Sequence, residues 1–324
     1  MITVLIAGVL GFVLSFGAIP LFIRQMQKLK LGQLIRDEGP AAHQHKAGTP
    51  TMAGLVFIPA AVLAYFITLL LSAWFYGTSP APSATAWLTL GFTVGMLAVG
   101  AADDIMKFRN KGNEGLTEIQ KTVGLLAVTL PFSYLAFQFP NSAGVTPAST
   151  AVSFVRDLPL DLMAPGAIVG TLLVMAWINL IALSGTNAVN FTDGLDGLAG
   201  GVMMTIFTGY LAMTVWQYSH RCVSAAGVGC YDVRDAGALA MIAAAFVGSL
   251  GGFLLWNVSK AQIFMGDSGS LALGGALVAF AIFTRTELLL PIIALVPVLE
   301  VFSVIVQKFV FKFSRKGSVS RGEK

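Results

Sequence analysis

Residues 166–216 read GAIVGTLLVMAWINLIALSGTNAVNFTDGLDGLAGGVMMTIFTGYLAMTVW. Two apolar runs, 166–183 and 198–216, flank a polar segment that holds Asp193 and Asp196. Each run is close to the roughly 20 residues that a helix needs to cross a bilayer. Carboxylates are costly inside lipid, so the segment between the runs belongs at a membrane surface. The stretch therefore predicts two membrane-spanning helices joined by an acidic loop.

The composition extends this prediction to the whole chain. Of 324 residues, 56% are hydrophobic and 11% are charged, whereas soluble domains have roughly 25% charged residues. Only helices would satisfy the backbone in lipid, because the alternation of a membrane strand is absent. We predict an all-α, polytopic membrane helical bundle of about nine spans, at residues 1–23, 53–75, 87–102, 122–139, 166–183, 198–216, 237–255, 269–284 and 288–310.

The positions of Lys and Arg predict the orientation of the bundle. Five, four, one and six of them lie in the segments 24–50, 103–121, 256–268 and 308–324, whereas the opposite loops hold only Arg156, Arg221, Arg234 and Arg285. Positive residues favour cytoplasmic loops, so we expect the N-terminus outside and the acidic loops inside. The longest predicted outer loop, 140–165, is expected to be a surface connection. Cys222 and Cys230 lie in another outer loop, where a disulfide is allowed but not required.

Two further acidic motifs end apolar runs. Asp103 and Asp104 follow the third predicted span, where carboxylates oppose the helix dipole. Asp267 lies in the string Gly266-Asp267-Ser268-Gly269-Ser270, which is typical of a turn and helix start. A solvated helix end and simple helix caps are the structural alternatives. They leave Asp196 and its neighbouring asparagines unexplained.

The predicted topology places all three acidic motifs on one side of the membrane. Mg²⁺ binds through one or two carboxylates plus substrate phosphates, so aspartates beside Lys107 favour a metal-phosphate site for phosphoryl or phosphosugar transfer. No glycine-rich phosphate loop with its lysine is present, which argues against transport driven by nucleotide hydrolysis. The net charge of +4 comes from inner loops and the tail, so we expect contact with membrane lipids and no nucleic-acid partner.

Four strings together resemble the polyprenyl-phosphate N-acetylhexosamine-1-phosphate transferases. They are His45-Lys46 with Gly48-Thr49-Pro50-Thr51-Met52, Asp103-Asp104 with Lys107, Asn187 to Gly197, and Phe264 to Ser270. The first string is similar to the branch that uses UDP-N-acetylmuramoyl-pentapeptide. The resemblance, from about residue 20 to 316, implies transfer of phospho-N-acetylmuramoyl-pentapeptide to undecaprenyl phosphate, giving lipid I and UMP. It also implies a bacterial inner (cytoplasmic) membrane enzyme with its active site facing the cytoplasm.

The same resemblance implies roles for individual residues. Asp103, Asp104 and Asp267 are the expected catalytic residues, and Asp267 and Asp193 are the expected Mg²⁺ ligands. The expected substrate-binding residues are Lys46, Thr51, Lys107, Lys121, Asn187, Asn190, Asp193, Asp196, Asn257, Phe264 and Gln307. Glu300, Ser303 and Gln307 share a helical face, which a hydrogen-bond network inside the bundle would also explain.

We expect a single transmembrane catalytic domain over residues 1–310, with active-site loops at 24–50, 103–121, 184–197 and 256–268, and a basic cytoplasmic tail over 311–324. The family normally continues into a loop with clustered histidines and a tenth span. This sequence ends at Lys324 without either, so we expect a tail that is truncated relative to the family.

Several alternatives stay open at this point. A related transferase of N-acetylglucosamine-1-phosphate would keep the same aspartates, and a non-catalytic lipid transporter would explain the spans. The reaction would be either direct attack by the lipid phosphate or a covalent two-step route. Small residues such as Gly248, Gly251 and Gly252 permit tight helix contacts within one chain or between two, which leaves a homodimer open.

Overall fold

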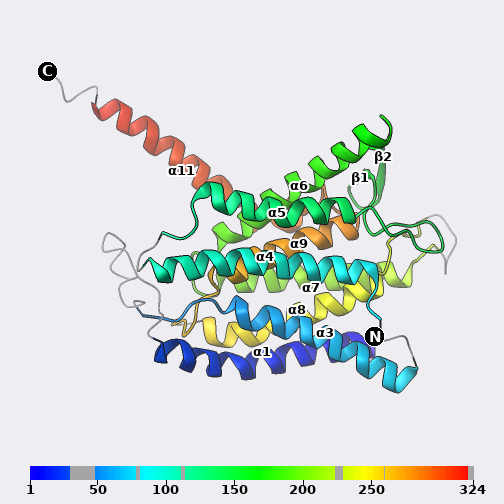
Figure 1. The fold of residues 1–324 in the computed structure, drawn as a ribbon, viewed down its shortest axis with the longest axis horizontal. Coiled ribbons are helices and arrows are strands. Elements are labelled where there is room, and N and C mark those ends of the chain that lie inside the picture. The colour runs from blue at the N-terminus through cyan, green and yellow to red at the C-terminus, as the bar shows by residue number, and fades with distance from the viewer. Residues whose placement is uncertain (30–47, 78–80, 111–113, 223–228, 259, 320–324) are drawn as a thin grey trace.

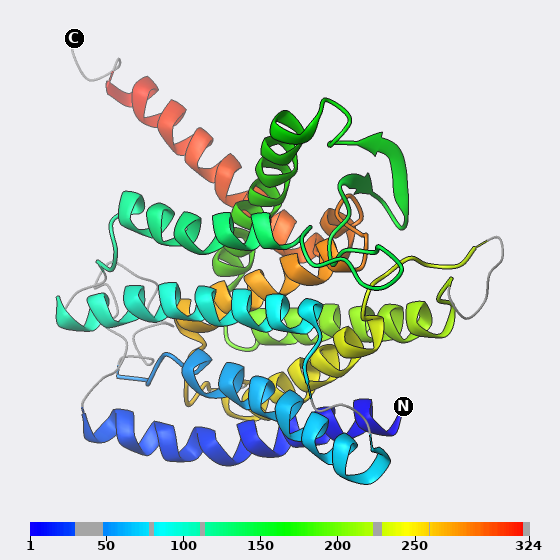
Figure 2. The same ribbon diagram turned by 45° about the vertical axis from the view of Figure 1, so that its right-hand side comes forward.

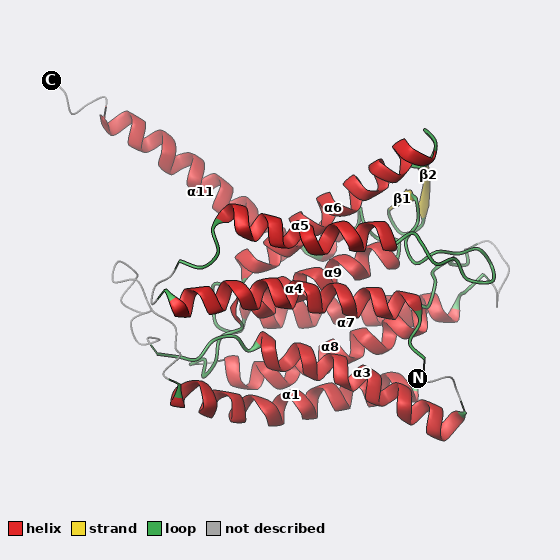
Figure 3. Ribbon diagram, in the orientation of Figure 1, coloured by secondary structure: helices red, strands yellow, loops and turns green. Residues whose placement is uncertain are grey.

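The computed structural model describes the chain except for residues 30–47, 78–80, 111–113, 223–228, 259 and 320–324. Nearly all of its secondary structure is helical (Figure 3). The helices are α1 (Ile2–Lys28), α3 (Gly54–Tyr76), α4 (Ala84–Arg109), α5 (Glu118–Leu135), α6 (Ala167–Thr192), α7 (Leu198–Ser219), α8 (Ala236–Asn257), α9 (Gly266–Phe283), α10 (Leu290–Ile293) and α11 (Leu295–Val319). Two short antiparallel strands, β1 (Ala151–Ser153) and β2 (Asp157–Asp161), form a hairpin between α5 and α6.

Seven of the described helices are long and apolar enough to cross a membrane: α1, α3, α4, α6, α7, α8 and α9. This confirms the prediction of a polytopic all-α membrane protein. The two other predicted spans are also helical, but their structure differs from a single apolar span. The span expected at 122–139 overlaps α5, which begins with a polar turn from Glu118 to Lys121 and ends at Leu135, four residues before the predicted end. The span expected at 288–310 is broken at Ala294 into α10 and α11.

The break before α11 has a local cause. Pro291 and Pro297 lie on its two sides, and proline removes a backbone donor from a helix. Beyond the break, α11 leaves the bundle, and it projects away from the other helices in both views (Figures 1 and 2). The loop 140–165, which we expected to be a surface connection, contains the β1–β2 hairpin, and all five residues of β2 are exposed. Asp157 stabilises this hairpin by accepting hydrogen bonds from Ser149 and Ser153.

The centre of the bundle is α9. Every residue from Ser268 to Phe283 is buried, and α3, α4 and α6 pack around this helix (Figure 1). A helix that is apolar on all sides is stable only inside a bundle. Its first turn carries Asp267, so the packing of α9 fixes the position of that carboxylate.

The two ends of the bundle have different characters. At one end, which we call the site end, α4, α6 and α8 finish and α5, α7 and α9 begin (Figure 1, left). The predicted acidic loops therefore do meet at one end. The other end, which we call the hairpin end, carries the β-hairpin and a disulfide between Cys222 and Cys230. The disulfide that the sequence left open is thus formed.

Helices α1 and α8 pack with their backbones in contact. A Cβ atom added to Gly248 would lie 1.9 Å from the carbonyl oxygen of Gly8, and one added to Gly11 would lie 2.4 Å from that of Ala245. Close backbone approach through small residues is a common way to join helices in lipid. These glycines are therefore needed for packing between α1 and α8 of the same chain.

We expect Gly248→Ala to destabilise the protein by about 1–3 kcal/mol, because overpacking forces the two backbones apart. Gly209→Ala on α7 is the matched control, since an added Cβ there would meet nothing within 4 Å. Thermal unfolding in detergent, followed by circular dichroism, measures both. Equal melting temperatures for the two variants would contradict the packing argument.

Candidate active site

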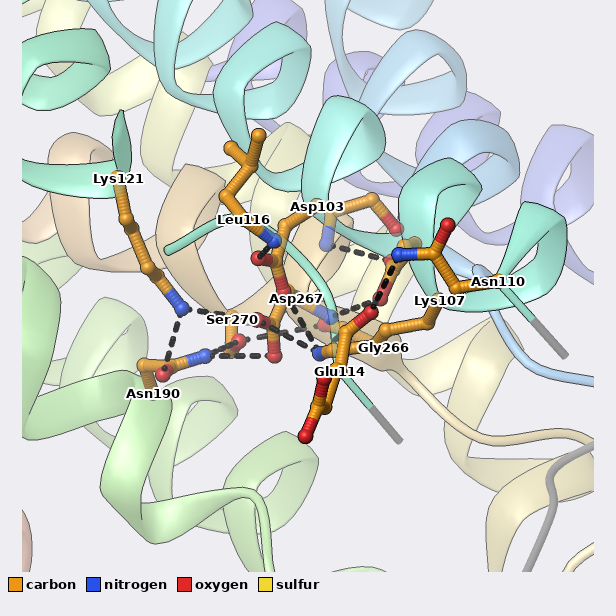
Figure 4. Close-up of polar contacts among 12 residues, drawn as sticks. Asp103, Lys107, Asn110, Glu114, Leu116, Lys121, Asn190, Gly266, Asp267 and Ser270 are labelled. Carbon is orange, nitrogen blue, oxygen red and sulfur yellow. Dashed lines mark hydrogen bonds and ion pairs between the residues drawn. The ribbon is translucent and has the colours of Figure 1, made fainter. Parts of the chain in front are cut away.

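Three carboxylates meet at the site end. Asp103 and Asp104 come from the last turns of α4, and Asp267 comes from the first turn of α9. Figure 4 shows Asp103 and Asp267 side by side. One ligand atom from each lies within 4.8 Å of the others. The approach depends on Gly100, where a Cβ atom would lie 2.1 Å from the backbone oxygen of Asp267. Only glycine allows α4 to come this close to the start of α9.

Two lysines contact the three carboxylates. The Nζ atom of Lys107 lies 2.7 Å from Asp103 Oδ2, 3.0 Å from Asp267 Oδ2 and 3.9 Å from Asp104 Oδ1. Lys121 of α5 adds a second ammonium 2.8 Å from Asp267 Oδ2. With all five groups ionised, one negative charge stays uncompensated. The cluster therefore attracts a further cation.

Asn190 connects α6 to this cluster. Its Nδ2 atom donates to Asp267 Oδ1 at 2.9 Å and to Ser270 Oγ at 2.8 Å, and its Oδ1 atom accepts from Lys121 at 3.4 Å (Figure 4). Both oxygens of Asp267 are therefore held. Sequence reasoning did not select Ser270 as a site residue. Its spacing of three residues from Asp267 on one helix was the available signal.

Asp104 caps α9 from another helix. Its Oδ1 accepts from the backbone N–H of Asp267 at 3.1 Å, and its Oδ2 accepts from that of Ser268 at 2.9 Å. The sequence predicted a local cap, but Met265, the residue before α9, accepts no capping hydrogen bond with its side chain. Asp103 instead accepts from the backbone N–H of Leu116 at 2.8 Å, which holds the segment before α5. Adjacent aspartates thus orient two different elements.

The Gly-Thr-Pro-Thr-Met string also reaches the site end. Phe264 N–H donates to Pro50 O at 2.8 Å, and Ala53 N–H donates back to Phe264 O at 3.1 Å. Thr51 consequently lies beside Gly266, where an added Cβ would be 3.0 Å from Thr51 Oγ1. This pairing joins two strings that the sequence analysis treated separately. Lys46 lies outside the described residues.

Asp193 and Asp196 follow the end of α6. Asp193 is half-buried, and its burial, together with the charges of Asp267 and Asp104, raises the pKa of its carboxyl to about 7. Its neighbours therefore include the carboxylate cluster, although Asp193 is not one of the three convergent side chains. Asp196 is half-buried in the turn before Gly197.

For three predicted substrate-binding residues, the hydrogen bonds that the structure describes lie outside the carboxylate cluster. Asn257 is buried, donates to Ile263 O at 2.8 Å and accepts from Gly197 N–H at 2.8 Å. Asn187 donates to Leu183 O on its own helix. Gln307 is exposed on α11 and donates to Ser303 Oγ at 3.2 Å. The structure does not bring these side chains into the carboxylate cluster, so their contact with a substrate stays a prediction.

We expect Asp104→Ala to lower the free energy of unfolding by about 1–3 kcal/mol, because two backbone N–H groups at the start of α9 lose their acceptor. Glu118→Ala removes an exposed carboxylate nearby and should change stability by no more than about 0.5 kcal/mol. Thermal unfolding of both variants in detergent checks this. An unchanged melting temperature for the Asp104 variant would show that the cap is dispensable.

The sequence of the chain matches the model of glycosyl transferase family 4 over residues 86–285, a range that includes all three clustered carboxylates. It is 48% identical to the phospho-N-acetylmuramoyl-pentapeptide-transferase of Kocuria rhizophila over 97% of this chain and 83% of the relative. The corresponding protein of Micrococcus luteus is 49% identical, over 97% of this chain and 84% of the relative. The similarity therefore covers the whole bundle and its cluster. The chain belongs to glycosyl transferase family 4, among the phospho-N-acetylmuramoyl-pentapeptide transferases, and is a phosphotransferase.

Proposed function

We propose that the chain transfers phospho-N-acetylmuramoyl-pentapeptide from its UDP donor to undecaprenyl phosphate, giving lipid I and UMP for peptidoglycan synthesis. The observation that carries this proposal is the cluster of Asp103, Asp104, Asp267, Lys107 and Lys121 at one end of a membrane bundle. A site of this kind serves a water-soluble phosphate donor and a membrane-bound acceptor at once. The names of the relatives support the identity of the transferred group.

The proposed site end faces the cytoplasm of the inner membrane. The basic segments that flank the acidic loops support this orientation, because Lys and Arg concentrate in cytoplasmic loops. A nucleotide-sugar donor made in the cytosol requires the same orientation. The hairpin end, with its disulfide, would then face the oxidising side.

The residues of the cluster fit Mg²⁺. They offer carboxylate oxygens, which hard divalent cations prefer. The ammonium group of Lys107 already lies within 3.9 Å of all three carboxylates, so the cluster accommodates a cation at its centre. Asp267 would hold the metal, with Asp103 or Asp193 as further ligands. Bound Mg²⁺ offsets the negative charge of the phosphates during transfer.

The side chains of the cluster have separate tasks in this proposal. Lys107 and Lys121 exchange carboxylate partners for donor phosphates, and Asn190 keeps Asp267 oriented through its hydrogen bond. Asp103 orients the lipid phosphate or takes its proton, so that this phosphate attacks in line while UMP leaves. Asp104 positions α9 and serves the reaction through it. The remaining donor contacts stay predictions, namely Lys46, Thr51, Asn187, Asp193, Asp196, Asn257, Phe264 and Gln307.

An apolar cavity of about 410 Å³ supports a lipid acceptor. It lies between α6 and the α10–α11 segment, and Asn187 and Phe191 line it near the site end. Asn187 is one helical turn from Asn190 of the cluster. A hydrocarbon chain in this cavity would therefore present its phosphate to the carboxylates.

We expect Asp267→Asn to lower the rate of lipid I formation at least about 100-fold, because the cluster loses the charge that holds the metal and both lysines. Asp161→Asn is the matched control, since Asp161 is exposed in the hairpin and should keep full activity. The assay follows labelled phosphosugar entering undecaprenyl phosphate in detergent with Mg²⁺. Weaker Mn²⁺ binding by the Asp267 variant, measured by electron paramagnetic resonance, tests the metal separately.

The same assay with UDP-N-acetylglucosamine distinguishes the related transferase. Transfer from that donor alone would replace the proposed substrate. If the folded, unmodified chain and the Asp161→Asn control both transfer nothing from either donor, the non-catalytic lipid transporter would be the remaining alternative.

Direct attack predicts that labelled UMP does not exchange into the donor when the acceptor is absent. We favour this route because the lipid phosphate is already anionic near neutral pH and gains little from a covalent protein intermediate. A covalent route would form an acyl phosphate on an aspartate, release UMP and run backward with added UMP. Label that appears in the donor before undecaprenyl phosphate is added would overturn direct attack.

A further inference from the structure

A second cavity, of about 700 Å³, lies at the hairpin end of the bundle. Its walls are the loop after α5, the last residues of α7 with the disulfide, and the start of α8. Its charged lining residues are three arginines and three aspartates: Arg221, Arg234, Arg285, Asp157, Asp232 and Asp235. The transferase reaction proposed above uses none of these residues.

Each of these arginines has a buried nitrogen without a hydrogen-bond partner among the described residues. The atoms are Arg221 Nε, Arg234 Nη1 and Arg285 Nη1. Arg285 is only 6% exposed, and its other nitrogens make long contacts, with Nη2 3.3 Å from Thr146 O and Nε 3.9 Å from Asp157 Oδ1. Buried N–H groups of a guanidinium without acceptors are costly, so three around one cavity indicate a missing acceptor.

The start of α8 adds to the positive potential of the cavity. Asp235, Ala236 and Gly237 line the cavity, and no side chain caps this helix. A helix of 22 residues presents a partial positive charge and free N–H groups at its N-terminus. The α8 terminus and the three arginines therefore favour the same kind of ligand.

The acidic residues of the lining satisfy these arginines only in part. Asp235 accepts from Arg234 Nε at 3.1 Å and from Thr85 at 2.8 Å, while the unpartnered Nη1 of Arg234 remains. Asp157 accepts from Ser149 and Ser153 and lies 3.9 Å from Arg285 Nε, and Asp232 is exposed. Within the described chain, the one cluster of carboxylates spaced for a metal lies at the site end. The unpartnered guanidinium nitrogens therefore favour an anion as the ligand of this cavity.

We infer that the cavity binds a phosphate-bearing ligand, with its phosphate held by Arg221, Arg234, Arg285 and the N-terminus of α8. Guanidinium groups match the planar pairs of oxygens on a phosphate. A volume of about 700 Å³ exceeds what one phosphate fills and lies in the range of small-molecule sites, so the ligand carries further groups. A phospholipid headgroup and a soluble phosphate ester share this chemistry.

The test uses the full chain in detergent and hydrogen–deuterium exchange of peptides that cover residues 229–240. The probes are inorganic phosphate, glycerol 3-phosphate and dihexanoyl phosphatidylglycerol, each compared with sodium chloride at equal ionic strength. We expect at least one probe to slow exchange in these peptides. Slower exchange with the soluble probes identifies a phosphate ester as sufficient, whereas slower exchange with the lipid alone identifies a headgroup.

The Arg221→Gln/Arg234→Gln double variant should bind the effective probe at least 10-fold more weakly while keeping its transferase activity. Arg24→Gln is the control, because Arg24 is exposed on α1, does not line this cavity and lies outside the measured peptides. It should bind as the unmodified chain does. No protection with any probe, or equal protection in the double variant, would overturn the inference. Transferase activity is measured separately, so failure of one proposal does not affect the other.

Discussion

The structure of the site end depends on the contact between Asp104 and the start of α9. Helix α9 is the most enclosed helix of the bundle, so its first N–H groups have little access to water. Unsatisfied donors in such a place would cost several kcal/mol in total. Asp104 supplies the acceptor from α4, and Gly100 allows the two backbones to approach closely enough. The same contact places Asp267 beside Asp103.

Three carboxylates that are buried together need nearby positive charges. Like charges at this distance repel, and desolvation adds to that cost. Lys107 and Lys121 offset most of the repulsion, and Asn190 fixes the orientation of Asp267. The lysines are thus held where phosphates would need them, without a large rearrangement of the backbone. The arrangement is stable without a substrate, and with all five groups ionised it keeps one uncompensated negative charge.

The sequence predicted this end of the molecule well where the signal was local. The lengths of the apolar stretches predicted the positions of the apolar helices. The distribution of Lys and Arg correctly predicted that the acidic loops lie at one end. The cross-helix roles were out of reach, because the cap that Asp104 provides depends on the packing of residues 163 positions apart. The contacts of the Asn257 amide with Gly197 and Ile263 were also out of reach, because nothing local in the sequence indicates them. Helix α11 projects from the bundle after the break at Ala294, and the length of the apolar stretch alone does not predict this break.

Helix α6 explains how a polar reaction and a lipid substrate can share one site. Its 26 residues span about 39 Å at 1.5 Å per residue, enough to cross the hydrocarbon layer. Asn187 faces the apolar cavity and Asn190 belongs to the cluster, so the change from apolar to polar surroundings occurs within one turn. Removing a polyprenyl chain from lipid would cost about 0.8 kcal/mol for each CH₂ group. An acceptor that stays in the cavity avoids this cost, and only its phosphate has to leave the apolar phase. In the proposed function, the single helical turn between Asn187 of the cavity and Asn190 of the cluster would bring the acceptor phosphate to the carboxylates.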